Sequence, residues 1–184
     1  MTAGLVRRAL LGLLLSGPVL AQSGPKPSLD NSLNTLKQAP SEAAAAALEA
    51  QIRALWAEAA TPAVRLLLAR GARELSESAF GDALDSFDAA LDLSPDLLEG
   101  WRGRAQTRRL MGDYVGAVRD IQEVLRREPR CFLALQDLSH VAEARGDWRG
   151  ALAAWQKVLE LSPHTPGGQT RLIDLRRRAL GEEL

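Results

Sequence analysis

The sequence has few of the residues that build disulfide frameworks, metal sites or aromatic binding platforms. Its 184 residues include one cysteine and two histidines, which exclude a disulfide within the chain and leave little to ligate a metal. Aromatic residues make up 4% of the chain, whereas alanine and leucine are abundant, and this bias favours helices over sheets. The 23 basic and 23 acidic side chains cancel, unlike the basic excess that nucleic-acid-binding proteins usually show.

Residues 1–21 have the pattern of a bacterial secretory signal peptide. Arg7 and Arg8 precede a run from Ala9 to Ala21 that carries no charge. This run is shorter than the roughly 20 apolar residues that a membrane-spanning helix needs. We therefore expect a periplasmic or secreted protein that begins at Gln22. The alternative is that the segment is retained and anchors the protein in the membrane.

A linker and two helices are predicted to follow. Residues 22–28 contain two prolines and a glycine, which is typical of a flexible linker. Residues 29–60 carry apolar side chains at helical spacing in two runs that Pro40 separates. Ser41 is well placed to cap the second run. We expect these two helices to form a hairpin that covers the beginning of the next domain.

A fixed period dominates the rest of the chain. Prolines recur every 34 residues, at positions 95, 129 and 163. The dipeptide Gly-Asp recurs at the same interval of 34 residues, at 112 and 146. This interval also relates three alanines, three aromatic residues and three large apolar residues. These are Ala83, Ala117 and Ala151; Phe80, Tyr114 and Trp148; and Phe87, Ile121 and Trp155. Such a period predicts helix pairs that stack in a row and share one continuous core.

The period resembles the tetratricopeptide repeat. The second half of that motif, Ala-x3-large apolar followed by Pro, is complete in all three copies, and small residues (Gly71, Ala105, Ser139) stand where the two helices of a pair approach closely. In the first helices, arginine replaces the usual Leu at residues 70 and 104, and Glu74, Arg108 and Ala142 replace the usual Tyr. The resemblance implies an all-α, right-handed solenoid of three pairs at 64–97, 98–131 and 132–165. Residues 166–184 are then expected to form a C-terminal capping helix and tail.

The resemblance also implies a non-enzymatic scaffold that holds a protein or peptide in a concave groove lined by the first helix of each pair. Register places the polar groove side chains at Arg65, Glu99, Arg102, Gln106, Arg109, Gln136, His140 and Glu143, among apolar ones at Leu68, Ala72, Leu75 and Leu133. Arg102 and Arg109 could together bind a carboxylate of the partner. Because 20 of the 23 basic residues are arginine, the alternative is that both are ordinary solvated side chains.

One known ligand of the family is disfavoured. Some members bind a chaperone's C-terminal carboxylate through a clamp of Lys, Asn and Arg. The corresponding positions here hold Leu68, Ala72, Gly103, Leu133 and Asp137, so this clamp is missing.

No catalytic motif is apparent in the sequence. It contains neither a nucleophile elbow nor a phosphate-binding glycine loop. Asp137, His140 and Glu143 share one helix, but their directions diverge by roughly 60° per step and do not converge on a metal. We therefore expect no cofactor, metal, nucleic acid or small-molecule substrate. An enzyme of unrecognised chemistry, and a self-associating protein whose groove is filled by its own residues 29–60, remain the alternatives.

Two further features each allow two interpretations. Cys131 is either a reactive thiol that forms an intermolecular disulfide or, as we favour, a small buried apolar residue between packed helices. Residues 62–97 carry a net charge of −4 and residues 98–131 one of +3. This asymmetry either orients a dipolar partner or stabilises the packing of adjacent repeats.

Overall fold

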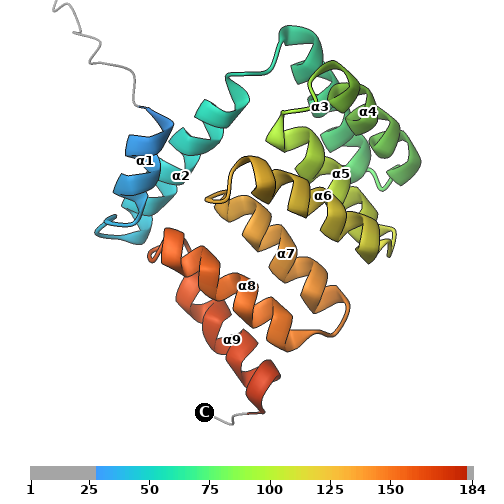
Figure 1. Cartoon of the computed structure of the whole chain (residues 1–184). Helices are drawn as coiled ribbons and strands as arrows, with labels where there is room; N and C mark the ends of the chain where they lie inside the picture. The colour runs from blue at the N-terminus through green and yellow to red at the C-terminus, as the bar shows by residue number, and fades with distance from the viewer. Residues whose placement is uncertain (1–27, 182–184) are drawn as a thin grey trace, which may run out of the picture.

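The computed structural model describes residues 28–181, which form nine helices and no strand (Figure 1). The predicted signal peptide and the linker before Ser28 lie outside the described residues. The helices are α1 (Leu29–Leu36), α2 (Glu42–Ala57), α3 (Pro62–Ser76), α4 (Phe80–Leu93), α5 (Leu98–Leu110), α6 (Tyr114–Arg127), α7 (Phe132–Ala144), α8 (Trp148–Leu161) and α9 (Gly168–Leu180). The chain is thus the all-α solenoid that the period predicts. Within residues 28–181, no helix is both long and apolar enough to cross a membrane.

Local sequence explains where most of these helices begin. The hydroxyls of Ser28, Ser41 and Thr61 accept hydrogen bonds from backbone N–H groups in the first turns of α1, α2 and α3. These bonds satisfy donors that have no partner inside the helix. The cap at Ser41 is the one that the sequence predicts.

The recurring Gly-Asp dipeptides make the turns inside the second and third helix pairs. Gly112 and Gly146 have φ angles of +82° and +73°, which glycine adopts at little cost. The following Asp113 and Asp147 then cap α6 and α8, each accepting a backbone N–H at 2.9 and 2.8 Å. The dipeptide therefore ends one helix and starts the next.

The three pairs α3–α4, α5–α6 and α7–α8 stack in chain order. Ala83, Ala117 and Ala151 are fully buried, as the register predicts. The ring of Phe87 fills the space between the first two pairs, because a Cβ at Gly71 would lie 3.0 Å from it and one at Gly103 would overlap it. Both glycines leave space for this ring. The motif predicts a small residue at Gly71, whereas the need for one at Gly103 becomes clear only in the structure.

The C-terminal helix α9 packs on α8. Leu172 and Leu175 join the core cluster that contains Ala151 and Trp155. The indole N–H of Trp155 donates to the carbonyl of Gly168 at 2.9 Å, which fixes the start of α9. The last pair therefore has its apolar face covered.

Helices α1 and α2 form the expected hairpin, but they do not cover the first pair. The hairpin lies along the edge where the loops between the pairs meet, beside the starts of α5 and α7 (Figure 1). The ring of Trp56 lies 5.5 Å from that of Phe132, and the Ser162 hydroxyl donates to Glu49 at 2.9 Å. Glu49 stands one repeat period before Ala83, so α2 has a carboxylate where a stacked second helix needs a small side chain.

This placement leaves the outer face of the first pair uncovered by the hairpin. Leu66 on α3 is 73% exposed, whereas its equivalents Gly100 and Ala134 are buried against the preceding pair. The hairpin also contacts the edge of the stack rather than running along the groove. The structure thus differs from our expectation of an end cap and does not favour a groove filled by residues 29–60.

Cys131 lies in the core between the hairpin and the repeats. Its side chain is fully buried, and this burial raises the pKa of the thiol to about 11. A buried thiol that holds its proton is a poor nucleophile. Cys131 is therefore a small apolar core residue, the interpretation that we favoured.

Candidate functional site

A hollow of about 460 Å³ lies between α3 and α5, which pack side by side as the first helices of their pairs. The wall formed by α3 is apolar and is completed by the ring of Phe87 from α4. The wall formed by α5 is largely polar. The lining residues are Leu68, Ala69, Ala72, Leu75, Phe87, Glu99, Arg102, Gly103 and Gln106. The hollow thus brings together three of the predicted polar groove residues and three of the apolar ones.

The polar wall is held in place by a buried carboxylate on α7. Asp137 accepts a hydrogen bond from Arg102 Nε at 2.8 Å and another from Gln106 Nε2 at 2.8 Å. Because Asp137 is buried, these charge-assisted bonds fix both side chains. The structure therefore pairs Arg102 Nε within the chain, while the binding of its guanidinium to a partner's carboxylate stays a prediction.

Within the described part of the chain, Glu99 is the one acidic side chain that lines the hollow. Its Oε2 atom is buried and has no hydrogen-bond partner among residues 28–181. Burial raises the pKa of this carboxyl above its usual value, and the charge of Arg102 only partly offsets the effect. A buried carboxylate oxygen without a donor is costly. Glu99 thus favours a ligand that brings an N–H or O–H group to it.

The other predicted groove residues lie outside the hollow. Arg65 is exposed and donates from Nη1 to the carbonyl of Ala60 at 2.6 Å. Glu143 forms an ion pair with Arg171 of α9 at 2.7 Å. The pKa of His140 is lowered, first by partial desolvation of the imidazole ring and then by the positive charge of Arg171. Arg109 and Gln136 are half-buried on α5 and α7.

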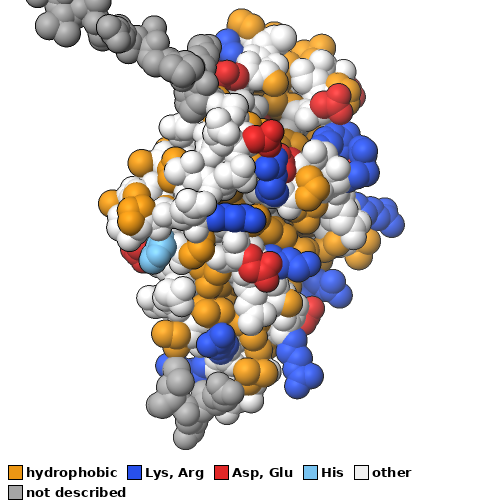
Figure 2. Space-filling view, turned by 60° about the vertical axis from the view of Figure 1, so that its left-hand side comes forward, with side chains coloured by type: hydrophobic (Ala, Val, Ile, Leu, Met, Phe, Trp, Pro, Cys, Tyr) orange, Lys and Arg blue, Asp and Glu red, His pale blue; other side chains and the backbone are white. Residues whose placement is uncertain are grey.

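The opposite charges of the first two repeats form ion pairs with one another. Arg104 on α5 pairs with Asp88 on α4, and Arg127 on α6 pairs with Asp96 in the loop after α4. In the space-filling view, acidic side chains lie next to basic ones rather than in a separate patch (Figure 2). These contacts support the second of our two interpretations, in which opposite charges join neighbouring repeats.

The four tryptophans differ in how deeply they are buried. Trp56 and Trp155 are buried, but Trp101 and Trp148 are only half-buried. The guanidinium groups of Arg104 and Arg127 lie 4.6 and 5.0 Å from the Trp101 ring centre. Such cation–π contacts occupy the ring with the protein's own charges.

Sequence reasoning missed the importance of Asp137 for the hollow. It stands one repeat period after Gly103 and two after Ala69, at a position that is small in the other two repeats. A buried acid in a packing position indicates that a basic partner lies close by. That partner is Arg102, at the neighbouring groove position.

Comparison with known proteins agrees with this geometry. The chain is 30% identical over 161 residues to a TPR repeat-containing protein of Rhizobium etli, an alignment that covers 88% of this chain and 79% of that relative. Among solved structures, it is similar to the Sgt2 TPR domain from Aspergillus fumigatus, with a TM-score of 0.60 and 22% identity over 65% of this chain and 81% of that one.

A second solved structure is similar in the same region. It is the first TPR of Spaghetti (RPAP3) bound to the HSP90 peptide SRMEEVD, with a TM-score of 0.58 and 18% identity over 65% of this chain and 94% of that one. No protein-family model matches the sequence. The repeat period, the stacked helix pairs and the relative from Rhizobium etli together show that the chain belongs to the tetratricopeptide repeat family.

Proposed function

We propose that the protein is an exported, non-catalytic scaffold that holds a segment of another protein in the hollow between α3 and α5. The observation that carries this proposal is the pairing of an apolar wall with Glu99, whose buried oxygen lacks a donor within the described residues. A protein segment provides both kinds of group that such a site needs, since apolar side chains alternate with backbone N–H groups along it.

The chemistry of the walls defines the segment further. One large apolar side chain packs against Leu68, Leu75 and the Phe87 ring, while an N–H donor or a basic side chain reaches Glu99. A related fold has been solved with a bound peptide, which supports this mode of binding. Arg102 already pairs with Asp137, so a carboxylate on the segment gains little from it.

The test is to block the hollow without disturbing the fold. Ala72 is exposed and lines the hollow, so Ala72→Arg places a bulky charge in it at little cost in stability. We expect the variant to bind the partner at least tenfold more weakly, a loss of about 1.4 kcal/mol. The measurement is affinity capture from a native envelope extract, followed by titration with the captured protein.

Leu66→Arg is the matched control, because Leu66 is exposed on the same helix but does not line the hollow. A partner that the wild type and Leu66→Arg capture equally, and that Ala72→Arg loses, supports the proposal. A partner that Ala72→Arg retains contradicts it. Arg102→Ala is a poorer probe, because it removes one of the two bonds that satisfy buried Asp137.

The export proposal makes a separate prediction. If residues 1–21 are a cleaved signal peptide, the protein isolated from its natural cells begins at Gln22 and is released with the periplasmic or secreted fraction. Mass spectrometry of the intact protein measures the N-terminus directly. A mass that includes Met1 or Thr2, together with recovery in the membrane fraction, would instead support the anchored alternative.

A further inference from the structure

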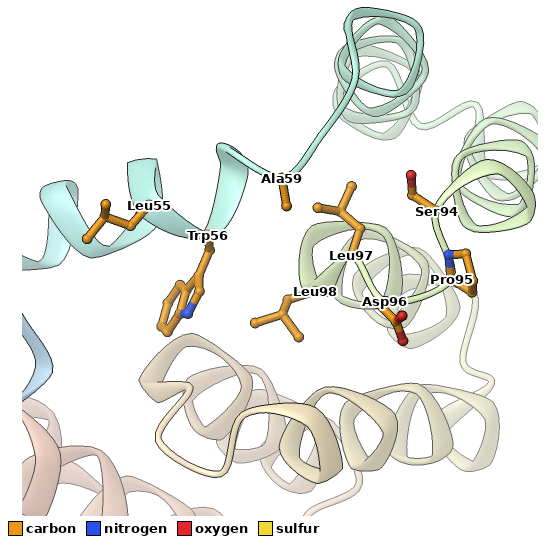
Figure 3. A pocket seen from close by; sticks show the side chains of 8 residues that line it. All are labelled: Leu55, Trp56, Ala59, Ser94, Pro95, Asp96, Leu97 and Leu98. Atoms are coloured by element: carbon orange, nitrogen blue, oxygen red, sulfur yellow. The ribbon is translucent and has the colours of Figure 1, made fainter. Parts of the chain in front are cut away.

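A second hollow, of about 400 Å³, lies outside the groove, where the end of α2 meets the loop between α4 and α5 (Figure 3). Leu55 and Trp56 of the hairpin form one side, and Pro95, Leu97 and Leu98 form the other. Its volume is in the range of pockets that hold small ligands. The pocket exists only because the hairpin lies against the edge of the stack.

The pocket contains a hydrogen-bond donor without an acceptor. Trp56 is 7% exposed, and its buried Nε1 has no hydrogen-bond partner within the described part of the chain. By contrast, the indole N–H groups of Trp101 and Trp155 donate to the carbonyls of Pro95 and Gly168 at 2.7 and 2.9 Å. Buried indole N–H groups ordinarily find such a partner. Trp56 is therefore the exception that needs an explanation.

The position of the indole supplies one. In Figure 3 the nitrogen lies on the side of the Trp56 ring that faces Leu98 and the interior of the pocket. The Leu98 side chain stands between this donor and the open volume. Leu98 is 8% exposed and borders the open volume of the pocket, so a change in its rotamer would expose the N–H to a molecule there.

The charges at the rim restrict the ligand further. Asp96 lines the pocket, and its carboxylate is 94% exposed while it pairs with Arg127 at 3.3 Å. Among residues 28–181, no basic side chain lines the pocket to hold an anion. A ligand with its own carboxylate would therefore meet a like charge, whereas a neutral one would not.

We propose that this pocket binds a small, neutral, mostly apolar molecule whose carbonyl or ether oxygen accepts the hydrogen bond of Trp56 Nε1–H. The apolar part of the molecule packs against Leu55, Leu97 and Leu98. This site is separate from the hollow between α3 and α5, and it stands or falls independently of the function proposed for that hollow.

The experiment compares two probes of nearly the same shape on the full chain. Acetophenone carries a carbonyl acceptor, and ethylbenzene has a methylene group in its place. Each is titrated to millimolar concentration while the four indole N–H signals are followed by nuclear magnetic resonance with ¹⁵N-labelled tryptophan. We expect acetophenone to move the Trp56 proton signal downfield in a saturable way and to bind three- to tenfold more tightly than ethylbenzene. This is about 0.65–1.4 kcal/mol, within the range of one net hydrogen bond.

Two variants separate the hydrogen bond from simple hydrophobic binding. Trp56→Phe keeps a ring but removes the donor, so the preference for acetophenone should vanish while ethylbenzene binds as before. Leu98→Ala uncovers the donor, so that preference should grow. If Trp56→Phe fails to fold, the paired titrations of the wild type and of Leu98→Ala still decide the matter.

Three results would overturn the proposal. The first is equal affinity of the wild type for both probes. The second is a Trp56 signal that stays fixed while those of Trp101 or Trp155 move. The third is a Trp56 signal that shifts when the protein alone is diluted, since a second copy of the chain would then occupy the pocket.

Discussion

Replacing Ala117 with glutamate is expected to abolish the stable packing of the middle repeat, at a cost of about 3 kcal/mol or more. Ala117 has no exposed surface and lies in the same core cluster as Ala105 and Ile121. The residues of this cluster are apolar, so the longer side chain would carry a charge into the core. Urea denaturation followed by circular dichroism measures the loss.

Val115→Glu is the control for that substitution. Val115 is 62% exposed on the same helix, so the same new charge should change the free energy of unfolding by no more than about 0.5 kcal/mol. A similar midpoint for Ala117→Glu and the wild type would contradict the register that places this alanine between the helices.

Replacing Asp120 with asparagine is expected to destabilise the protein by about 3 kcal/mol, which is typical when one partner of a buried ion pair is removed. Asp120 is 2% exposed and bonds to two arginines of α5. Its Oδ1 accepts from Arg104 Nη2 at 2.9 Å, and its Oδ2 accepts from Arg108 Nη1 at 2.8 Å. The variant keeps the shape of the side chain but leaves both guanidinium groups without its charge.

The matched control is Asp96→Asn, which removes an aspartate that also pairs with an arginine. Because the Asp96 side chain is almost fully exposed, water takes its place beside Arg127. We expect a loss below about 1 kcal/mol. Equal melting temperatures for Asp120→Asn and Asp96→Asn would show that the buried network contributes no more than a surface pair.

Asp120 also explains why this chain departs from the usual repeat motif. Arg104 and Arg108 stand where the motif has Leu and Tyr, and both pair with Asp120. In the first repeat the same three positions hold another polar set: Glu74 accepts bonds from Arg70 at 2.7 Å and from Ser86 at 2.6 Å. The third repeat has Leu138, Ala142 and Ala154 there and packs without charges.

These substitutions show what the sequence can and cannot predict. The repeat period locates the three pairs and the buried alanines, because each interface repeats the same local geometry. The period does not reveal the polar sets. In the sequence each of these residues is a separate deviation from the motif, and only the structure shows that residues 12 or 16 positions apart are hydrogen-bonded to one another.

The position of the hairpin is the larger surprise. Amphipathic spacing predicts α1 and α2, but their docking depends on contacts such as Trp56 with Phe132 that no period describes. Glu49 is the one available warning, since a carboxylate at that register position is incompatible with stacking on the first pair. The pocket beside Trp56 is formed by this docking, so the sequence alone could not predict it.

The sequence predicts which residues line the groove but not which of them are already hydrogen-bonded within the chain. Register correctly places Glu99, Arg102 and Gln106 on one wall of the hollow. The register does not tell whether each of these side chains has a hydrogen-bond partner within the chain, because that depends on residues of a neighbouring repeat. Asp137 determines that Arg102 is paired, whereas Glu99 keeps an oxygen without a donor.

The contact between the hairpin and the far end of the stack has a consequence for synthesis. In an ordinary array each repeat contacts only its neighbours, so it assembles in step with translation. Here Glu49 bonds to Ser162, which is 113 residues later. At about 5–20 residues per second, roughly 6–23 s separate the two on the ribosome. The hairpin can meet α5 of the second repeat earlier, but its bond to Ser162 forms only after the third repeat is made, so helices made early complete their packing late.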